Sequence, residues 1–372
     1  MVGAGPIGSA AARHLARRGR AVALVGPAFG DTSQVFSSHH DQGRVCRTLD
    51  RVPTWTALNV ASLSGIEALE AEVGIPVRRP TGCLLATNDP GHGWFDVAPE
   101  LEIDPAVAAA WPYALPGAVR YGLEGPPAGI LVVPELLRAQ HTALVAAGGT
   151  RHPHPLVRRT SGPPGHVLTL ADGRVLEAPT VVLCPGAYVN AWLDDPLDVV
   201  LETETVLLVP VDEARARDMA TVPTLLWDGE GSGWQSPYVV PPLRFADGRT
   251  YLKIGCDLDL DHRFVDVDDV RAWFVSGDSA AQRPALVDAA ATVIPSLSTD
   301  DAVTRRCILT RTPHAHPMIG EVGPGLFVGA GGHGWAAMAS DGIGELVART
   351  VAGEAWPDDI PDGTCAVRWR SP

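Results

Sequence analysis

Short apolar runs and helical spacings alternate at both ends of the chain. Residues 21–25 and 181–184 are apolar runs of the kind that form buried parallel strands, and residues 326–330 repeat the pattern near the C-terminus. Ahead of the first run, Ile7, Ala11 and Leu15 recur every four residues, as on one face of a helix. The two ends of the chain therefore predict strand and helix units around a parallel sheet.

The rest of the chain predicts further helices and a second region of strands. Helical spacing occurs at residues 55–73, 136–147 and 335–351, and residues 167–176 predict a hairpin with Asp172 and Gly173 at its turn. Residues 82–134 are rich in proline and glycine, and residues 203–301 have the pattern of strands and loops. We therefore expect an α/β fold with an α+β second lobe. Its parts are a discontinuous Rossmann-like nucleotide-binding domain of residues 1–80, 135–202 and 302–372, and an inserted substrate domain with a mixed or antiparallel sheet, of residues 81–134 and 203–301.

Size and charge restrict the class of partner. At 372 residues the chain is longer than a single core usually allows, which favours two lobes. A net charge of −14 argues against nucleic acid or an anionic membrane surface as a partner, and no apolar run reaches the roughly 18 residues of a membrane span. The six cysteines form no CxxC pair, and the chain begins inside a strand with no room for a signal peptide. We therefore expect a cytoplasmic protein, as a monomer or small homo-oligomer.

A glycine motif in the first turn indicates a class of ligand. Gly3, Gly5 and Gly8 have the GxGxxG spacing, which lets a turn approach a pyrophosphate at the start of a helix. The acidic residue that usually binds the ribose at the end of the second strand is missing, because Gly26 stands in its place. A dinucleotide site is the hypothesis, and a glycine-rich turn in an unrelated α/β domain is the alternative.

Four segments spread over nearly the whole chain carry a more specific pattern. They read GAGPIG at residues 3–8, SSHHDQGRVCR at 37–47, LKIG at 252–255, and CILTRTPHAHPMIG at 307–320 followed by GAGGHGW at 329–335. In this order they resemble the D-amino-acid oxidase superfamily of FAD-dependent oxidoreductases, and within it the monomeric sarcosine oxidase and N-methyltryptophan oxidase branch. The resemblance implies an oxidase acting on CH–NH or CH–NH2 groups. A secondary or N-alkylated amino acid would pass a hydride to flavin N5 and become an imine, and O2 would reoxidise the flavin and form H2O2.

The resemblance also implies roles for single residues. Cys307 matches the cysteine that is joined to the flavin 8α-methyl carbon by a thioether, so we expect covalent FAD; a small buried hydrophobe is the alternative. Lys253, the sole lysine, matches the lysine that promotes reaction with O2; an exposed strand lysine is the alternative. Arg47 matches the anchor of the substrate carboxylate, whereas Arg44 and His40 match residues beside the flavin. Surface arginines in a loop are the alternative.

The remaining FAD contacts are expected from three segments. The last of them would face the flavin ribityl chain and N1–C2=O edge, where the following helix stabilises negative charge. The alternative there is a plain strand-to-helix turn. The expected contacts are Gly3, Gly5, Pro6, Ile7 and Gly8, then Ser38, His39 and Arg44, and finally Gly329, Gly331, Gly332, His333 and Gly334.

Departures from the family pattern fall in the substrate pocket. Ala336 stands where the sarcosine oxidase pattern has a lysine, so the second carboxylate anchor is missing. Asp257 stands in the place of a histidine four residues beyond Lys253, and Tyr238 is a candidate pocket residue with packing as its alternative. We therefore predict a substrate pocket that binds a small-molecule amine or amino acid and differs from the pocket of the sarcosine oxidase pattern.

Three other functions stay open at this point. A flavin dehydrogenase or biosynthetic imine-forming enzyme on the same fold would use an electron acceptor other than O2. A non-catalytic flavin-binding module is suggested by the departures at Gly26 and Ala336. Aromatic hydroxylation is disfavoured, because the last segment lacks an acidic Gly-Asp pair.

No metal site is expected, since the pairs His152 with His154 and His314 with His316 lack acidic or cysteine partners.

Overall fold

The computed structural model describes residues 1–29, 42–163, 165–276 and 279–371. At its centre, Val2 lies between two parallel strands: its N–H donates to the carbonyl of Val182 at 2.8 Å, and the N–H of Gly3 donates to the carbonyl of Val25 at 2.8 Å. The start of the chain is thus the middle of a parallel sheet, as the apolar runs predict. This sheet consists of β7 (Thr150–His152), β1 (Ala23–Val25), the Val2 bridge, β11 (Val181–Leu183), β20 (Leu326–Ala330) and the antiparallel β19 (Met318–Gly323).

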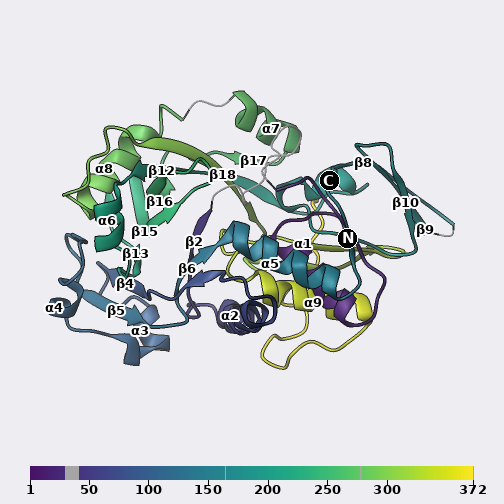
Figure 1. The fold of residues 1–372 in the computed structure, drawn as a ribbon, viewed down its shortest axis with the longest axis horizontal. Helices are drawn as coiled ribbons and strands as arrows, with labels where there is room; N and C mark the ends of the chain where they lie inside the picture. Colours follow the sequence, from purple (N-terminus) through teal and green to yellow (C-terminus); the bar gives the residue numbers. More distant parts are fainter. Residues whose placement is uncertain (30–41, 164, 277–278, 372) are drawn as a thin grey trace.

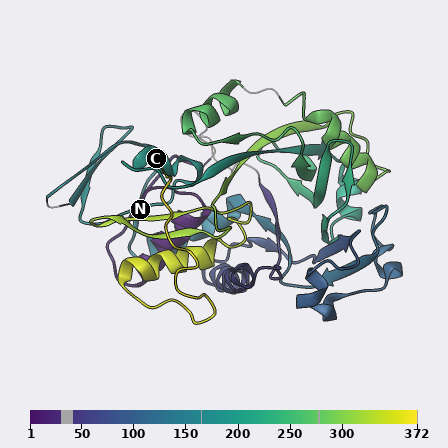
Figure 2. The ribbon, with the colours of Figure 1, turned by 180° about the vertical axis from the view of Figure 1, so that it is seen from behind.

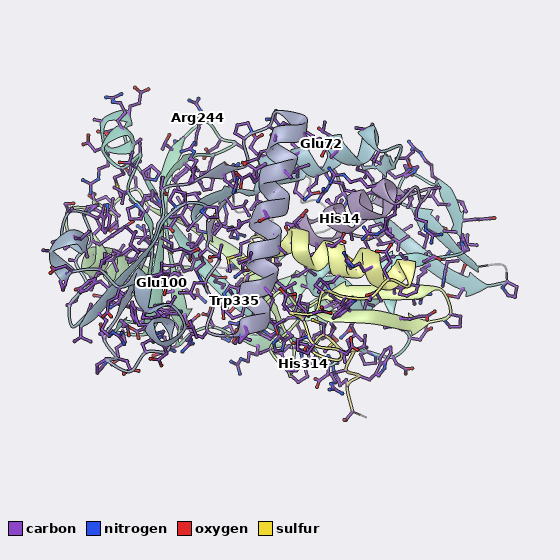
Figure 3. All side chains as sticks on the ribbon, turned by 90° about the horizontal axis from the view of Figure 1, so that it is seen from below. His14, Glu72, Glu100, Arg244, His314 and Trp335 are labelled. Carbon is purple, nitrogen blue, oxygen red and sulfur yellow. The ribbon has the colours of Figure 1, made fainter. Side chains whose placement is uncertain are left out.

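Four helices pack beside this sheet (Figure 1). Helix α1 contacts α5 and α9, and α9 also contacts α2. Gly344 permits the close approach of α9 to α1, because a Cβ at this position would lie 2.6 Å from the Cβ of Ala10. In Figure 3, α2 runs across the molecule between the lobe of the largest sheet and α9. The helices are α1 (Pro6–Arg17), α2 (Pro53–Val73), α5 (Val133–Ala146) and α9 (Ser340–Ala352).

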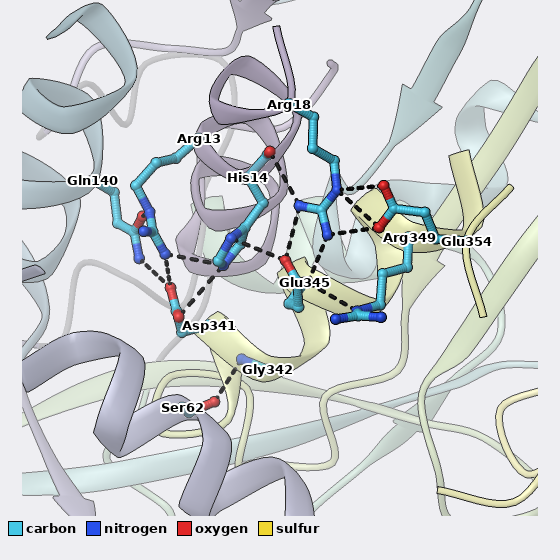
Figure 4. Close-up of polar contacts among 10 residues, drawn as sticks. All are labelled: Arg13, His14, Arg18, Ser62, Gln140, Asp341, Gly342, Glu345, Arg349 and Glu354. Carbon is cyan, nitrogen blue, oxygen red and sulfur yellow. Dashed lines mark hydrogen bonds and ion pairs between the residues drawn. The ribbon is translucent and has the colours of Figure 1, made fainter. Parts of the chain in front are cut away.

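A buried polar network joins these helices (Figure 4). The guanidinium of Arg13 on α1 donates to Asp341 on α9, and its Nε donates to Gln140 Oε1 on α5 at 2.6 Å. Gln140 Nε2 donates to the same Asp341 carboxylate at 3.0 Å. On α2, the hydroxyl of Ser62 accepts from the backbone N–H of Gly342 at 2.7 Å. The network therefore fixes α1, and with it the turn in front of α1, against α5 and α9, and it also joins α9 to α2.

The second lobe is built on the largest sheet. In the described residues nine strands form it, and Leu252, Ile254 and Val239 pack against Leu286 and Val293 of α8 (Arg283–Val293) in its core. The strand order is β17 (Arg263–Phe264), β12 (Val200–Pro210), β16 (Thr250–Leu258), β15 (Trp234–Arg244), β13 (Thr224–Trp227), β4 (Cys83–Thr87) and β5 (Arg120–Glu124), with β14 (Glu230–Gly231) on β15 and β18 (Val303–Arg311) on β12.

Two small sheets complete the fold. The first contains β2 (Gly43–Cys46), β6 (Gly129–Val132) and β3 (Arg78–Arg79), and β2 contacts β15 of the largest sheet. The second contains β8 (Leu156–Gly162), β9 (Gly165–Leu170) and β10 (Val175–Ala178), and it lies at the opposite end of the molecule from the largest sheet (Figures 1 and 2). The short elements are α3 (Trp94–Val97), η2 (Pro99–Leu101), α4 (Pro105–Ala108), η3 (Gly186–Trp192), α6 (Glu213–Asp218) and α7 (Val267–Ser276).

The predicted fold class is confirmed: an α/β sheet with a Rossmann-like start and a second lobe on a mixed sheet. The β9–β10 hairpin is confirmed too, with Gly173 at a φ of 85° in its turn. The helix expected from residue 335 begins only at Ser340. Residues 203–301 contain α7 and α8, which the expectation of strands and loops missed. The domain boundaries stay a prediction. Within the described residues, no helix is long and apolar enough to cross a bilayer.

Candidate functional site

A cavity of about 610 Å³ lies where the parallel sheet, β2 and the largest sheet meet. Its volume is within the usual range for ligand pockets. Its wall combines the first glycine turn, the turn after β11, strand β18, the loop after β20 and helix α7. The lining residues that bear on the argument are Gly3, Gly5, Pro6, Ile7, Gly26, Pro27, Arg44, Cys184, Glu204, Arg271, Phe274, Cys307, Gly329, Gly331, Gly332, Gly334 and Ala336.

The first glycine turn forms one end of the cavity. Gly3 has a φ of 106°, and a Cβ at this position would overlap the carbonyl of Cys184. A Cβ on Gly8 would overlap the carbonyl of Gly3, so Gly8 supports the turn from behind although it does not line the cavity. Gly5 is the N-cap of α1 and offers no side-chain acceptor, and the first turn of α1 carries no acidic residue. The free N–H groups at this helix start therefore suit an anion.

The loop after β20 lines the cavity with glycine backbone at Gly331, Gly332 and Gly334. Gly331 has a φ of 88°, and a Cβ there would overlap the methyl group of Thr312. His333, with a φ of 51°, turns its ring away from the cavity toward Thr312, whose hydroxyl lies 2.8 Å from His333 Nε2. Burial, and then the charge of Arg311, lowers the pKa of His333 to about 4. The ring of this predicted cofactor ligand is therefore neutral and structural, and only its backbone neighbours face the cavity.

Arg44 and Cys307 meet at the cavity wall from different sheets. Arg44 on β2 places Nη2 4.0 Å from the Sγ of Cys307 on β18. Both residues line the cavity, and Cys307 is 4% exposed and forms no disulfide. A guanidinium stabilises a thiolate over a thiol. The two residues therefore form a cysteine site in which a cation adjoins a largely desolvated sulfur.

Glu204 is a cavity residue that the sequence pattern did not single out. It lies on β12 directly opposite Cys307, so the two side chains share one face of the sheet. The hydroxyl of Tyr238 donates to Glu204 Oε1 at 2.7 Å. The available signal was the alternation of Glu202 and Glu204 in a strand that is otherwise apolar apart from two threonines, since alternate strand residues face one side. Tyr238 itself does not line the cavity, but it contacts a residue that does.

Lys253 lies just behind the cavity wall. Its side chain is 1% exposed, and Nζ donates to the carbonyl of Gly43, the residue before Arg44, at 2.7 Å. The same Nζ lies 5.2 Å from the ring centroid of Tyr238. Lys253 is thus a buried lysine next to the cavity. The alternative interpretation, an exposed lysine on a strand, is wrong. Its role toward O2 stays a prediction.

Two further predicted residues lie away from the lining. Arg47 is buried and pairs with Asp50 at 3.0 Å, while its Nη1 has no hydrogen-bond partner among the described residues. Asp257 is an exposed residue of β16, opposite Gln235. Desolvation of its carboxyl group, and then the charge of Glu204, raises the pKa of Asp257. The structure brings neither residue into the cavity wall.

Three predicted site residues cannot be placed. Ser38, His39 and His40 lie outside the described residues. Gly26 and Pro27, which replace the expected acidic ribose ligand, do line the cavity. A Cβ at Gly26 would lie 2.7 Å from the backbone nitrogen of Ala4, so the close packing of the first turn excludes a larger residue at this position.

Comparison with known proteins gives a family and a fold. The family described as "FAD dependent oxidoreductase" matches residues 1–350. Among solved structures, the chain is similar to NikD, an unusual amino acid oxidase essential for nikkomycin biosynthesis, at 19% identity and a TM-score of 0.75, with 99% of this chain and 96% of that chain covered. L-proline dehydrogenase from P. horikoshii has 16% identity and a TM-score of 0.75, covering 95% and 93%. Glycine oxidase from Geobacillus kaustophilus has 20% identity and a TM-score of 0.70, covering 98% and 96%. No curated protein matches the sequence.

Proposed function

Because the chain belongs to the FAD-dependent oxidoreductase family, we propose that it oxidises the carbon–nitrogen bond of a secondary or N-alkylated amino acid and uses O2 as electron acceptor. Bound FAD supplies the hydride acceptor for this reaction and passes the electrons on to O2. The products are an imine, which is hydrolysed or rearranges, and H2O2. Similar structures include an amino acid oxidase, a glycine oxidase and a proline dehydrogenase, all named for amine or amino-acid substrates.

The residues of the cavity fit FAD. Gly5 lines the cavity at the N-cap of α1, whose first N–H groups suit a pyrophosphate, and Gly3 lets the turn pack closely against the carbonyl of Cys184. At the other end, the backbone of Gly331 and Gly332 forms a wall without side chains against which a flat ring system can lie. Cys307 and Arg44 adjoin the same space. One continuous cavity thus offers an anion site and a backbone wall free of side chains, as a dinucleotide with an aromatic ring requires.

The observation that carries the covalent part of the proposal is the 4.0 Å approach of Arg44 Nη2 to Cys307 Sγ in the cavity wall. The thioether requires a thiolate, and a buried cysteine without a cation would resist ionisation. Arg44 supplies that cation. We propose that Cys307 holds FAD through this link, and that Arg44 favours the ionised sulfur.

In this proposal Arg47 positions the substrate by binding its carboxylate. Its Nη1 is a buried donor without a hydrogen-bond partner among the described residues, and such a donor is costly unless a ligand or water satisfies it. A substrate carboxylate satisfies it with a charge-assisted bond. The small side chain of Ala336 in the cavity wall offers no second cation. Arg47 does not line the cavity of this structure, so its side chain must reach the substrate from outside that lining to provide the main carboxylate contact. A substrate larger than sarcosine compensates for the missing second cation through other contacts.

Lys253 provides the positive charge that favours electron transfer to O2. Its buried ammonium next to the cavity wall lies in a region of low dielectric, where a charge acts more strongly than in water. The dehydrogenase alternative differs from this proposal only in the acceptor. Rapid mixing of the reduced protein with air, compared with mixing with an artificial dye acceptor, tests the oxidase proposal: fast reaction with air supports it, and reaction with the dye alone contradicts it.

A further inference from the structure

Two glutamates on the same face of β12 have opposite surroundings. Glu202 accepts from Arg263 Nε at 2.8 Å and from Arg311 Nε at 2.6 Å, so two arginines balance its charge. Glu204, two residues further along, lines the cavity and receives only the hydroxyl of Tyr238 among the described residues. No described residue forms an ion pair with it. Within residues 1–29, 42–163, 165–276 and 279–371, the cavity therefore contains a carboxylate without an ion-pair partner.

We propose that Glu204 binds a cationic group of the substrate, separate from the nitrogen that is oxidised, so that the preferred substrates are amino acids with a basic side chain. This inference rests on the proposed function and narrows its substrate class. The reacting nitrogen is excluded as the partner because hydride loss from the adjacent carbon requires a free lone pair on nitrogen. A carboxylate beside that nitrogen would stabilise the protonated, unreactive amine.

The immediate surroundings of Glu204 favour a cationic ligand. Its Oε1 is fixed by Tyr238, whose ring is in turn held near Lys253, so the carboxylate is oriented before any ligand binds. A pre-oriented acceptor loses little entropy on binding and forms stronger charge-assisted bonds.

The test compares two ligands that differ only in charge. 5-(Trimethylammonio)pentanoate carries a fixed ammonium group, and 6,6-dimethylheptanoate has an uncharged tert-butyl group of the same shape in its place. Neither has a nitrogen lone pair, so neither can be oxidised. Calorimetry with the FAD-loaded protein is expected to show about tenfold tighter binding of the ammonium ligand. Glu204→Gln keeps the side-chain shape and an acceptor for Tyr238, and should abolish this preference. Glu202→Gln, which changes the balanced carboxylate of the same strand, should retain it.

A kinetic comparison extends the test to substrates. The ratio of kcat/KM for Nα-methyl-lysine to that for N-methylnorleucine is expected to be ten- to a hundredfold in the unaltered protein, as a charge-assisted hydrogen bond provides. In Glu204→Gln the ratio should approach one. A ratio near one in the unaltered protein overturns the inference but leaves amine oxidation standing.

Two further results distinguish a failure of the proposed function from a failure of the cation subsite. If no amine reduces the flavin but calorimetry still shows a cation preference that depends on Glu204, the proposed function fails and the cation subsite stands. If Glu204→Gln loses FAD or shifts the flavin absorbance and keeps the cation preference, Glu204 serves the cofactor and the inference is wrong. Tyr238→Phe is a second variant, expected to weaken cation preference only partly, because it removes the orientation of Oε1 and keeps the charge.

Discussion

Arg44 Nη2 lies 4.0 Å from the sulfur of Cys307, although β2 and β18 belong to different sheets. The contact joins the small sheet of β2 to the largest sheet at the cavity wall. A cofactor linked at Cys307 would therefore be attached to the largest sheet, while its phosphates would lie against α1.

The first prediction concerns the attachment of FAD. Acid precipitation of the purified protein should leave the yellow colour in the pellet, and Cys307→Ala should release it into the supernatant, because the alanine lacks the sulfur. Cys256→Ala is the control, since Cys256 is a buried cysteine of β16 outside the cavity wall. Free FAD in the supernatant of the unaltered protein would rule out the link.

Arg44→Met gives a separate test of the thiolate. The variant keeps an apolar side chain of similar length and removes the cation 4.0 Å from Cys307 Sγ. Since the cation favours the ionised sulfur, the apoprotein variant incubated with FAD should form the covalent link more slowly, by about tenfold or more. Bound flavin is measured in the acid pellet over time. An unchanged rate would show that Arg44 does not act on the sulfur.

The second prediction concerns the reaction with O2. A unit charge about 4 Å from the developing negative charge, at an effective dielectric near 20, is worth about 4 kcal/mol, or about a thousandfold in rate. Lys253→Met should therefore slow reoxidation by about this factor in stopped-flow mixing with air, and affect anaerobic reduction much less. Lys253→Arg, which keeps the charge, should recover part of the rate. Equal loss in both half-reactions would show that Lys253 serves the structure, through its bond to the Gly43 carbonyl.

The third prediction concerns the substrate carboxylate. Arg47→Ala should lower kcat/KM for carboxylate-bearing amines by roughly ten- to a hundredfold, since one charge-assisted bond contributes about 1.5–3 kcal/mol. Asp50→Asn is the control, because it frees Arg47 from its only described ion pair and keeps the guanidinium. Sarcosine, which lacks other groups to bind, should be a poor substrate. Sarcosine as the best substrate, or an unaffected Arg47→Ala, contradicts this assignment.

The sequence predicted the parts of the site that depend on local backbone geometry. The glycine turn at Gly3 and the wall at Gly331 need missing Cβ atoms, and such positions show directly as glycines. Cys307 and Arg44 were selected from a family resemblance, and both line the cavity. Glu204 was missed because its position depends on pairing β12 with β18, a contact between distant segments that a local pattern does not contain.

The local sequence pattern also predicted neither the orientation of the His333 ring nor helix α8. The ring of His333 bonds Thr312 instead of lining the cavity, and its backbone has a positive φ; the motif reveals neither feature. Helix α8 was missed within a region of strand-like runs, although Leu286, Ala290 and Val293 have helical spacing and face the core of the largest sheet. In that region the apolar content alone suits either a strand or a short helix.

The fourth prediction concerns the buried network of Figure 4. Burial on its own would raise the pKa of Asp341, but the hydrogen bond from His14 and the charges of His14 and Arg13 outweigh it, so the pKa lies well below its usual range. Asp341→Ala leaves Arg13 buried and unpaired and should lower the free energy of unfolding by about 3–5 kcal/mol. Glu72→Ala, which removes an exposed ion pair with Arg17, should have a much smaller effect. Urea denaturation measures both. Similar losses in the two variants would contradict the importance of burial.

The fifth prediction concerns stability in mild acid. Burial lowers the pKa of His333 to about 4 and that of His141 to about 3, from 6.5 in the unfolded chain. Unfolding therefore takes up protons below pH 6.5, and the free energy of unfolding should fall as the pH drops from about 6.5 toward 4. His333→Asn, which tolerates the positive φ, should flatten this dependence by up to a few kcal/mol. An unchanged slope would show that His333 is not the titrating group.

The most direct test of the account is anaerobic mixing of the purified yellow protein with a panel of N-methyl and cyclic amino acids, followed by flavin absorbance. At least one of these amines is expected to bleach the flavin, and admission of air is expected to restore the colour with one H2O2 per turnover. A flavin that no amine reduces, although chemical reductants reduce it fully, would contradict the assignment of this cavity to amine oxidation.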